Sequence, residues 1–112
     1  MNSCNFVGNL VNEPMYFDGQ VPRAVFTLAV DHNRKSADGQ RKAEFLDFVA
    51  WHGVAEFVHR YCHKGDAISV QNCMAKRRKI EADDGTVTYR TEFQVDNVEL
   101  VRRAKANMEE GN

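Results

Sequence analysis

The strongest constraint on the fold of this chain is a set of short runs whose side chains alternate with a period of two. That period is typical of β-strands, whose successive side chains point to opposite faces. Residues 23–31 (RAVFTLAVD) and 44–51 (EFLDFVAW) are the clearest examples. Residues 3–11 and 66–81 also indicate strands, and Asp84-Gly85 closes a hairpin to a return strand.

One segment, residues 53–65 (GVAEFVHRYCHKG), follows the spacing of a helix instead. Its apolar stripe at i, i+3, i+4 and i+7 consists of Val54, Phe57, Val58 and Tyr61. Three strands, a short helix and a two-stranded hairpin match the five-stranded Greek-key barrel known as the OB-fold. We therefore expect an all-β barrel of five strands, with one short helix between strands 3 and 4.

The length of the chain, 112 residues, is enough for one domain with a single core. We expect that domain to span residues 1–101, with a bulge near Asp96-Asn97 and a short polar tail at 102–112 that frays. No run reaches the ~18 apolar residues of a membrane helix, and no secretory signal stands at the N-terminus. Three cysteines without a CxxC pattern predict free thiols in a reducing cytoplasm.

Residues 44–51 contain more large aromatic side chains than one core can use. A small barrel is filled from inside, so Leu46, Phe48 and Ala50 are expected to point inward. Phe45 and Trp51 then point outward, roughly 20 Å apart at ~3.3 Å per residue. An exposed aromatic can stack on any nucleic-acid base, a contact worth ~1–3 kcal/mol.

A run of four basic residues could hold phosphates beside those aromatics. It consists of Lys76, Arg77, Arg78 and Lys79. The formal net charge is only −1, so the local distribution of charge carries this prediction rather than the sum. Alternation sends Lys76 and Arg78 to one side of the strand and Arg77 and Lys79 to the other.

Other interpretations of the same residues stay open. Outward aromatics are often buried at a subunit interface, and a basic run can protect a strand edge against aggregation. Asp47 lies between the two aromatics and would repel phosphate. It could instead accept a hydrogen bond from a base amino group or from an arginine.

Several stretches together resemble the bacterial-type single-stranded DNA-binding protein (SSB) family, in order and spacing, over roughly residues 2–100. They are FVGNLVNEP, FTLAVD, EFLDFVAW, AEFVHRYCHKGD and TEFQVDNVEL. The resemblance implies an OB-fold, sequence-tolerant binding of single-stranded DNA in replication, recombination and repair, and a cytoplasmic, nucleoid-associated location. It also implies a homotetramer, with a dimer as the alternative, and neither catalysis nor a cofactor.

The same resemblance assigns roles to individual residues. It places Phe45 and Trp51 on base-stacking positions, and Arg77 and Lys64 on basic positions. We add a set of lower-ranking contributors to phosphate binding: Arg34, Lys35 and Arg90.

The chain departs from the family pattern at several positions. His32, Asn33 and Arg34 replace a usual aromatic, and Lys79 and Ile80 replace another. Cys73 stands where a basic residue is frequent, and Asp47 where Asn or Arg is common. We therefore expect binding that depends more on phosphate contacts and falls steeply with salt.

The last residues, MEEGN, lack the linker and acidic tip of the family, so we expect no recruitment of replication or repair enzymes by that route. A PriB-like primosomal protein, or a phage, plasmid or mobile-element form, is an alternative. A protein-interaction OB-fold is another. The spacing of His59, Cys62 and His63 is a weak metal pattern, and no catalytic motif occurs, so we expect neither a metal nor enzyme activity.

Overall fold

The protein is described here by a computed structural model that covers the backbone of residues 1–110 and the side chains of residues 1–108. It is mostly β, with seven strands and two helices within those residues. The elements are β1 (Cys4–Leu10), β2 (Met15–Phe17), β3 (Arg23–Asp31), β4 (Ala43–Trp51), α1 (His52–Tyr61), β5 (Ala67–Glu81), β6 (Val87–Gln94), β7 (Asn97–Arg102) and α2 (Lys105–Glu110). No helix in that part of the chain is long and apolar enough to span a membrane.

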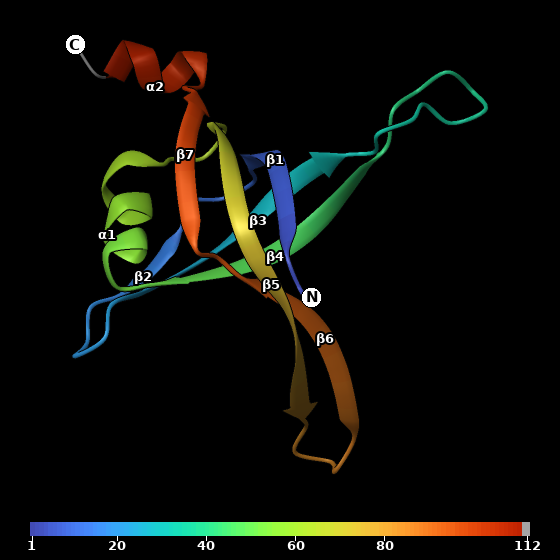
Figure 1. Cartoon of the computed structure of the whole chain (residues 1–112), viewed down its shortest axis with the longest axis vertical. Coiled ribbons are helices and arrows are strands. Elements are labelled where there is room, and N and C mark those ends of the chain that lie inside the picture. The colour runs from blue at the N-terminus through green and yellow to red at the C-terminus, as the bar shows by residue number, and fades with distance from the viewer. Residues whose placement is uncertain (111–112) are drawn as a thin grey trace.

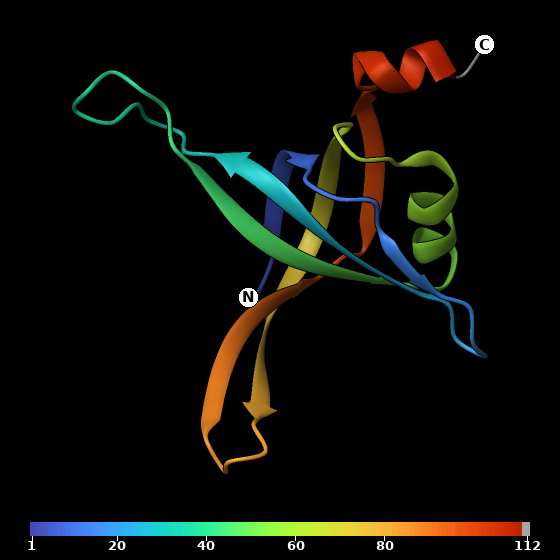
Figure 2. The same cartoon turned by 180° about the vertical axis from the view of Figure 1, so that it is seen from behind.

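Five of the strands close into a ring. β1 pairs with both β3 and β5, β3 pairs with β4, and β5 pairs with β6, all antiparallel. A short parallel contact between β4 and β6 completes the ring, with Phe48 opposite Phe93. Figures 1 and 2 view the ring from opposite sides. β5 lies in front of β3 and β4 in Figure 1 and behind them in Figure 2.

The core lies inside the ring and matches the predicted inward face of residues 44–51. Phe48 and Ala50 are fully buried, and Leu46 is half-buried. The Phe48 ring stacks on Phe26 of β3 with centroids 5.5 Å apart. α1 closes one end of the ring through Val58, which is also fully buried.

The expectation of five strands and one helix is wrong in detail. β2 is an additional strand of only three residues, too short for a period of two to be visible in the sequence. The predicted return strand is divided into β6 and β7, which pair with different halves of β5. This break at Val95-Asp96 lies at the expected irregularity near Asp96-Asn97.

The helix also ends earlier than predicted. α1 stops at Tyr61, because Cys62 has an extended backbone (φ −112°, ψ 126°) and its side chain is fully buried in the core. Residues 63–66 then form a turn, in which the Asp66 N–H donates to the His63 carbonyl at 3.0 Å. A helical pattern in the sequence could not reveal this turn, because Lys64 and Gly65 fit a helix end as well as a turn.

The tail also differs from expectation, because residues 105–110 form α2 instead of fraying. The buried carboxylate of Asp66 accepts hydrogen bonds from the Ala104 N–H at 2.8 Å and from Asn107 Nδ2 at 2.7 Å. Residues 111–112 of the expected tail lie outside the described part of the chain, as do the side chains of Glu109 and Glu110.

The three cysteines are free thiols in the structure. Cys62 and Cys73 are buried, and burial raises the pKa of each thiol to about 11. Cys73 is therefore part of the core, and its side chain does not stand on the surface where a basic residue would contact a ligand.

Candidate nucleic-acid interface

The outward-facing side chains of β2, β3 and β4 form one continuous surface, called the outer face below. Cross-strand register sets its rows. Phe17 of β2 lies opposite Arg23 of β3, which lies opposite Trp51 of β4. Further along the strands, Val25 lies opposite Val49, and Thr27 opposite Asp47.

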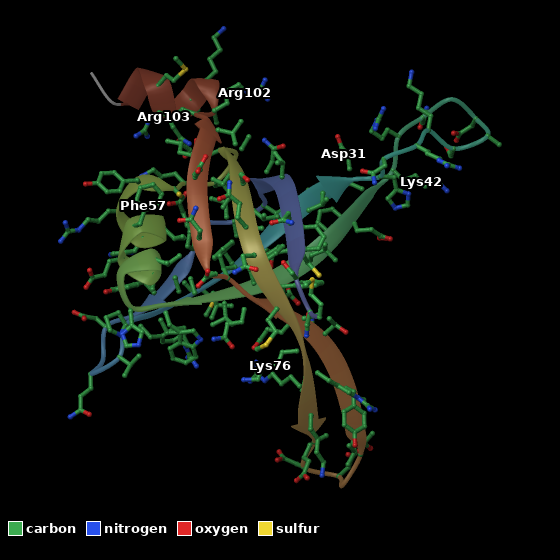
Figure 3. All side chains as sticks on the ribbon, in the orientation of Figure 1. Asp31, Lys42, Phe57, Lys76, Arg102 and Arg103 are labelled. Atoms are coloured by element: carbon green, nitrogen blue, oxygen red, sulfur yellow. The ribbon has the colours of Figure 1, made fainter. Side chains whose placement is uncertain are left out.

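A groove of about 440 Å³ joins one end of the outer face to the hairpin of β5 and β6. Its lining comes from β3, β4, β5 and β6, and consists of Arg23, Val25, Val49, Trp51, Lys76, Arg77, Arg78, Lys79 and Glu92. The structure thus brings Trp51 and the whole basic run together. Figure 3 shows Lys76 extending from β5 where the hairpin leaves the ring.

Trp51 is half-buried at the end of β4, where it also stands just before α1. Val49 has the same outward parity as Trp51 in β4, but it is only 4% exposed. The cause is the crossing of the hairpin over this end of β4, which makes Val49 part of the groove floor. Strand alternation correctly predicts the direction in which these side chains point, but not how far the hairpin buries them.

Two basic side chains of β5 have exposed or partly exposed acidic partners. Arg78 Nη1 lies 3.4 Å from Glu92, and Lys79 Nζ lies 3.0 Å from Glu81. Arg77 takes a different contact, with its Cζ 3.7 Å from the centroid of the Tyr89 ring. Surface ion pairs contribute only ~0–1 kcal/mol, so these cations can exchange a carboxylate for a phosphate at little cost.

Asp47 has two partners on the outer face. Its Oδ1 accepts a hydrogen bond from Thr27 Oγ1 at 2.9 Å, and its Oδ2 lies 2.7 Å from Arg90 Nη2. Of the two alternatives for Asp47, the structure therefore shows the arginine contact. Arg90 neutralises the carboxylate and lines, with Asp47 and Arg78, a second cavity of about 240 Å³ beside the groove.

Phe45 lies on the outer face at the other end of β4, opposite Ala29. Its side chain is 68% exposed, which is the solvent exposure expected of an outward aromatic. It does not line the groove, so it and Trp51 are two separate apolar positions along one strand.

The remaining basic candidates lie elsewhere. Arg34 and Lys35 belong to the loop between β3 and β4, which projects from the body of the molecule (Figure 1). Asp31 and Lys42, labelled in Figure 3, mark the base of this loop. Arg34 lines a separate cavity of about 730 Å³ together with Asp31 and His32.

Lys64 lies in the turn between α1 and β5. Its N–H donates to the carboxylate of Glu13, and this bond, with a second one from His63, lowers the pKa of Glu13. Its carbonyl accepts from Asn107 Nδ2 at 3.1 Å. Lys64 is thus next to α2 and is not among the residues that line the groove.

The three residues of the metal pattern point in different directions. Cys62 is buried in the core. The His59 ring stacks on Tyr16 with centroids 4.1 Å apart, and His63 Nδ1 lies 3.0 Å from Glu13 Oε1. No cluster of three metal-ligating side chains occurs in the described residues.

Sequence reasoning missed three residues of this region: Phe17, Arg23 and Tyr89. Phe17 belongs to a strand that is too short to recognise from the sequence. Arg23 is the first residue of an alternating strand, and a polar residue at that position indicates only where the strand begins. The outward parity of Arg23 with Val25 was the one available signal.

Fold and surface together define a class: a small ring of β-strands with aromatic side chains and a basic hairpin on one outer face. More particularly, the chain belongs to the single-strand binding protein family, whose family model matches residues 1–101.

Three bacterial relatives illustrate the similarity. A single-stranded DNA-binding protein of Streptococcus pyogenes serotype M3 is 34% identical over 99% of this chain and 68% of its own length. Single-stranded DNA-binding protein 2 of Listeria monocytogenes is 32% identical over 97% of this chain and 69% of its own. The single-stranded DNA-binding protein of Lactiplantibacillus plantarum is 31% identical over 90% of this chain, which spans only 51% of that relative.

Proposed function

We propose that this protein binds single-stranded DNA with little sequence preference and without catalysis. It coats and protects the strand during DNA replication, recombination and repair, in the cytoplasm and associated with the nucleoid. The observation that carries the proposal is the groove in which Trp51 meets the basic run of β5. Family membership and the names of the relatives support it independently.

The ring of strands is, in this proposal, the Greek-key barrel of the OB-fold. Two features support this: five strands close on one another, and α1 stands between β4 and β5 in the chain. The OB-fold binds oligonucleotides on an outer face, which is where the aromatic and basic residues of this chain gather.

The mechanism combines stacking with charge. Trp51 and Phe45 each hold a base against an aromatic ring, and this contact tolerates any sequence because every base has a π-face. Lys76, Arg77, Arg78 and Lys79 hold the phosphates that pass along the hairpin. Arg90, Arg34, Lys35 and Lys64 are further basic positions that a longer strand could reach.

Self-association also belongs to the proposal, as a homotetramer with the dimer as alternative. Family membership supports it, and so does the exposure of Val7 (56%) on β1. Light scattering on the purified protein, with and without an oligonucleotide, measures the number of subunits directly.

Alanine substitution tests the stacking. Trp51→Ala and Phe45→Ala should each weaken the binding of a poly-pyrimidine strand by about 5- to 150-fold, which corresponds to ~1–3 kcal/mol per stacked base. Tyr61→Ala removes an aromatic that is exposed on α1 and serves as the matched control. Unchanged affinity in both outer-face variants would contradict stacking and favour a protein-interaction role for this face.

A further inference from the structure

One row of the outer face places an arginine between two aromatic side chains. Phe17, Arg23 and Trp51 lie side by side on three adjacent strands. The Arg23 Cζ lies 4.3 Å from the centroid of the Phe17 ring and 5.9 Å from that of Trp51. The guanidinium is thus placed between two aromatic rings by the register of the sheet.

The guanidinium of Arg23 lacks partners of its own. Its Nε is buried and has no hydrogen-bond acceptor, and no carboxylate of the described residues forms an ion pair with it. A buried donor without an acceptor costs free energy. Because this Nε is closed to solvent, an anionic ligand in the groove would instead meet the terminal nitrogens of the guanidinium, which have no acceptor in the described residues either.

Arg23 also opens toward the ligand path. It lines the same groove as Trp51 and the basic run of β5. Arg78 and Lys79 of the hairpin have acidic partners, Glu92 and Glu81, whereas the contacts of Arg23, like that of Arg77, are aromatic only. Since an arginine presents its donors in a planar fork that fits phosphate oxygens, the groove has a ready anion-binding group next to its tryptophan.

We propose that Arg23 binds the backbone phosphate of the nucleotide whose base stacks on Trp51, and that Phe17 is the positioning residue that holds its guanidinium plane. This inference rests on the proposed function and names a contact within it. Base and phosphate of one nucleotide are separated by a single sugar, which suits the short distance between the Trp51 ring and Arg23.

The salt dependence of binding tests Arg23. Each phosphate contact with a single strand contributes about 0.7 to the slope of log K against log salt concentration. Arg23→Gln should therefore make that slope shallower by roughly 0.7. Arg60→Gln, which removes an exposed cation from α1, is the control of equal charge and should leave the slope unchanged.

A second variant separates charge from shape. Arg23→Lys keeps the cation but loses the planar fork, so it should weaken binding while the slope stays near the wild-type value. If Arg23→Gln fails to fold, as judged by urea unfolding, this variant decides the matter. Arg23→Lys with wild-type affinity would overturn the proposal.

A double-mutant cycle tests the positioning role of Phe17. Phe17→Leu keeps an apolar side chain, so it should weaken binding in the wild type but have no further effect in the Arg23→Gln background. If Phe17→Leu weakened binding by the same factor in the wild type and in the Arg23→Gln background, the positioning role would be contradicted. A residue that only supports the fold acts regardless of Arg23.

Titration of the wild-type protein distinguishes failure of the proposed function from failure of the role of Arg23 alone. Oligo-pyrimidine DNA that neither binds nor quenches Trp51 would overturn the proposed function, and this inference with it. Binding and quenching in the wild type, with the same salt slope in Arg23→Gln, Arg60→Gln and wild type, would overturn the role of Arg23 alone.

Discussion

At the scale of single residues, the outer face has a carboxylate near its middle, which would repel a phosphate. Asp47 lies between Phe45 and Trp51 in β4, yet it is 33% exposed and paired with Arg90. The pair lowers the repulsion that a phosphate would meet, but it also occupies the Arg90 guanidinium. We therefore expect Asp47 to limit the affinity of the face for DNA without abolishing it.

Asp47→Asn should raise the affinity for single-stranded DNA, because it removes a negative charge and releases Arg90. An exposed ion pair contributes ~0–1 kcal/mol, so the gain is roughly up to fivefold. Fluorescence anisotropy of a labelled oligonucleotide measures it. Glu56→Gln changes the net charge equally on the remote surface of α1, and a similar gain there would show that only net charge matters.

The directions of Phe45 and Trp51 could be predicted because strand parity alone sets them. The partner of Asp47 could not, since Arg90 is 43 positions away and reaches it only through the hairpin that β5 and β6 form. For the same reason, the contact of Arg23 with Phe17 could not be predicted, because it depends on the pairing of β2 with β3.

At the scale of elements, the long strand β5 serves two partners because it bends. Asn72 has a positive φ of 53° and separates the half of β5 that pairs with β7 from the half that pairs with β6. Its N–H donates to Asn5 Oδ1 at 2.9 Å, and its Nδ2 donates to Asp96 at 3.1 Å. The bend directs the basic part of β5 away from the ring and toward the groove.

Asn72→Ala should destabilise the fold by about 1–3 kcal/mol, because alanine loses the side-chain hydrogen bonds and is strained at positive φ. Asn72→Gly loses the same bonds without the strain and should be the less damaging of the two. Urea unfolding at pH 7 measures both. An alanine variant as stable as the glycine variant would show that the backbone relaxes at this position.

The carboxylate of Asp66 is one of the groups that anchor α2 to the ring. Burial alone would raise the pKa of Asp66, but hydrogen bonds from the Ala104 N–H, the Asn107 amide and the His63 N–H together lower it. A carboxylate with a lowered pKa stabilises the fold above its unfolded pKa near 4. That contribution is lost as the pH falls through the lower, folded-state value.

Asp66→Asn should therefore cost about 1–3 kcal/mol at pH 7, since an amide cannot accept all of these hydrogen bonds. Part of the difference from wild type should disappear as the pH falls toward 3. Urea unfolding at the two pH values tests this, with Glu56→Gln as control. A difference that stays constant with pH would mean that the charge of Asp66 is unimportant.

At the scale of the whole molecule, two hairpins extend beyond the closed ring (Figure 1). The radius of gyration is 15.4 Å, whereas a compact chain of this length has about 13 Å. One hairpin carries Arg34 and Lys35, and the other carries the basic run of β5. These six cations are thus held on projecting elements, although the net charge of the chain is −1.

The general plan of this molecule was predictable, because long alternating strands and one helical stripe appear directly in the sequence. β2, α2 and the exact end of α1 were not, because each depends on tertiary contacts: pairing with β3, the Asp66 hydrogen bonds and the burial of Cys62. Local pattern is weak wherever a segment is short or polar.

The measurement that tests the central claim most directly uses Trp51, the only tryptophan of the chain. The protein is titrated with a poly-pyrimidine single strand at low and high salt while Trp51 fluorescence is recorded, with duplex DNA as control. We predict strong quenching by the single strand, little by the duplex, and a weaker association at high salt. A salt-sensitive association without quenching would contradict the account, because it would place Trp51 outside the path of the DNA.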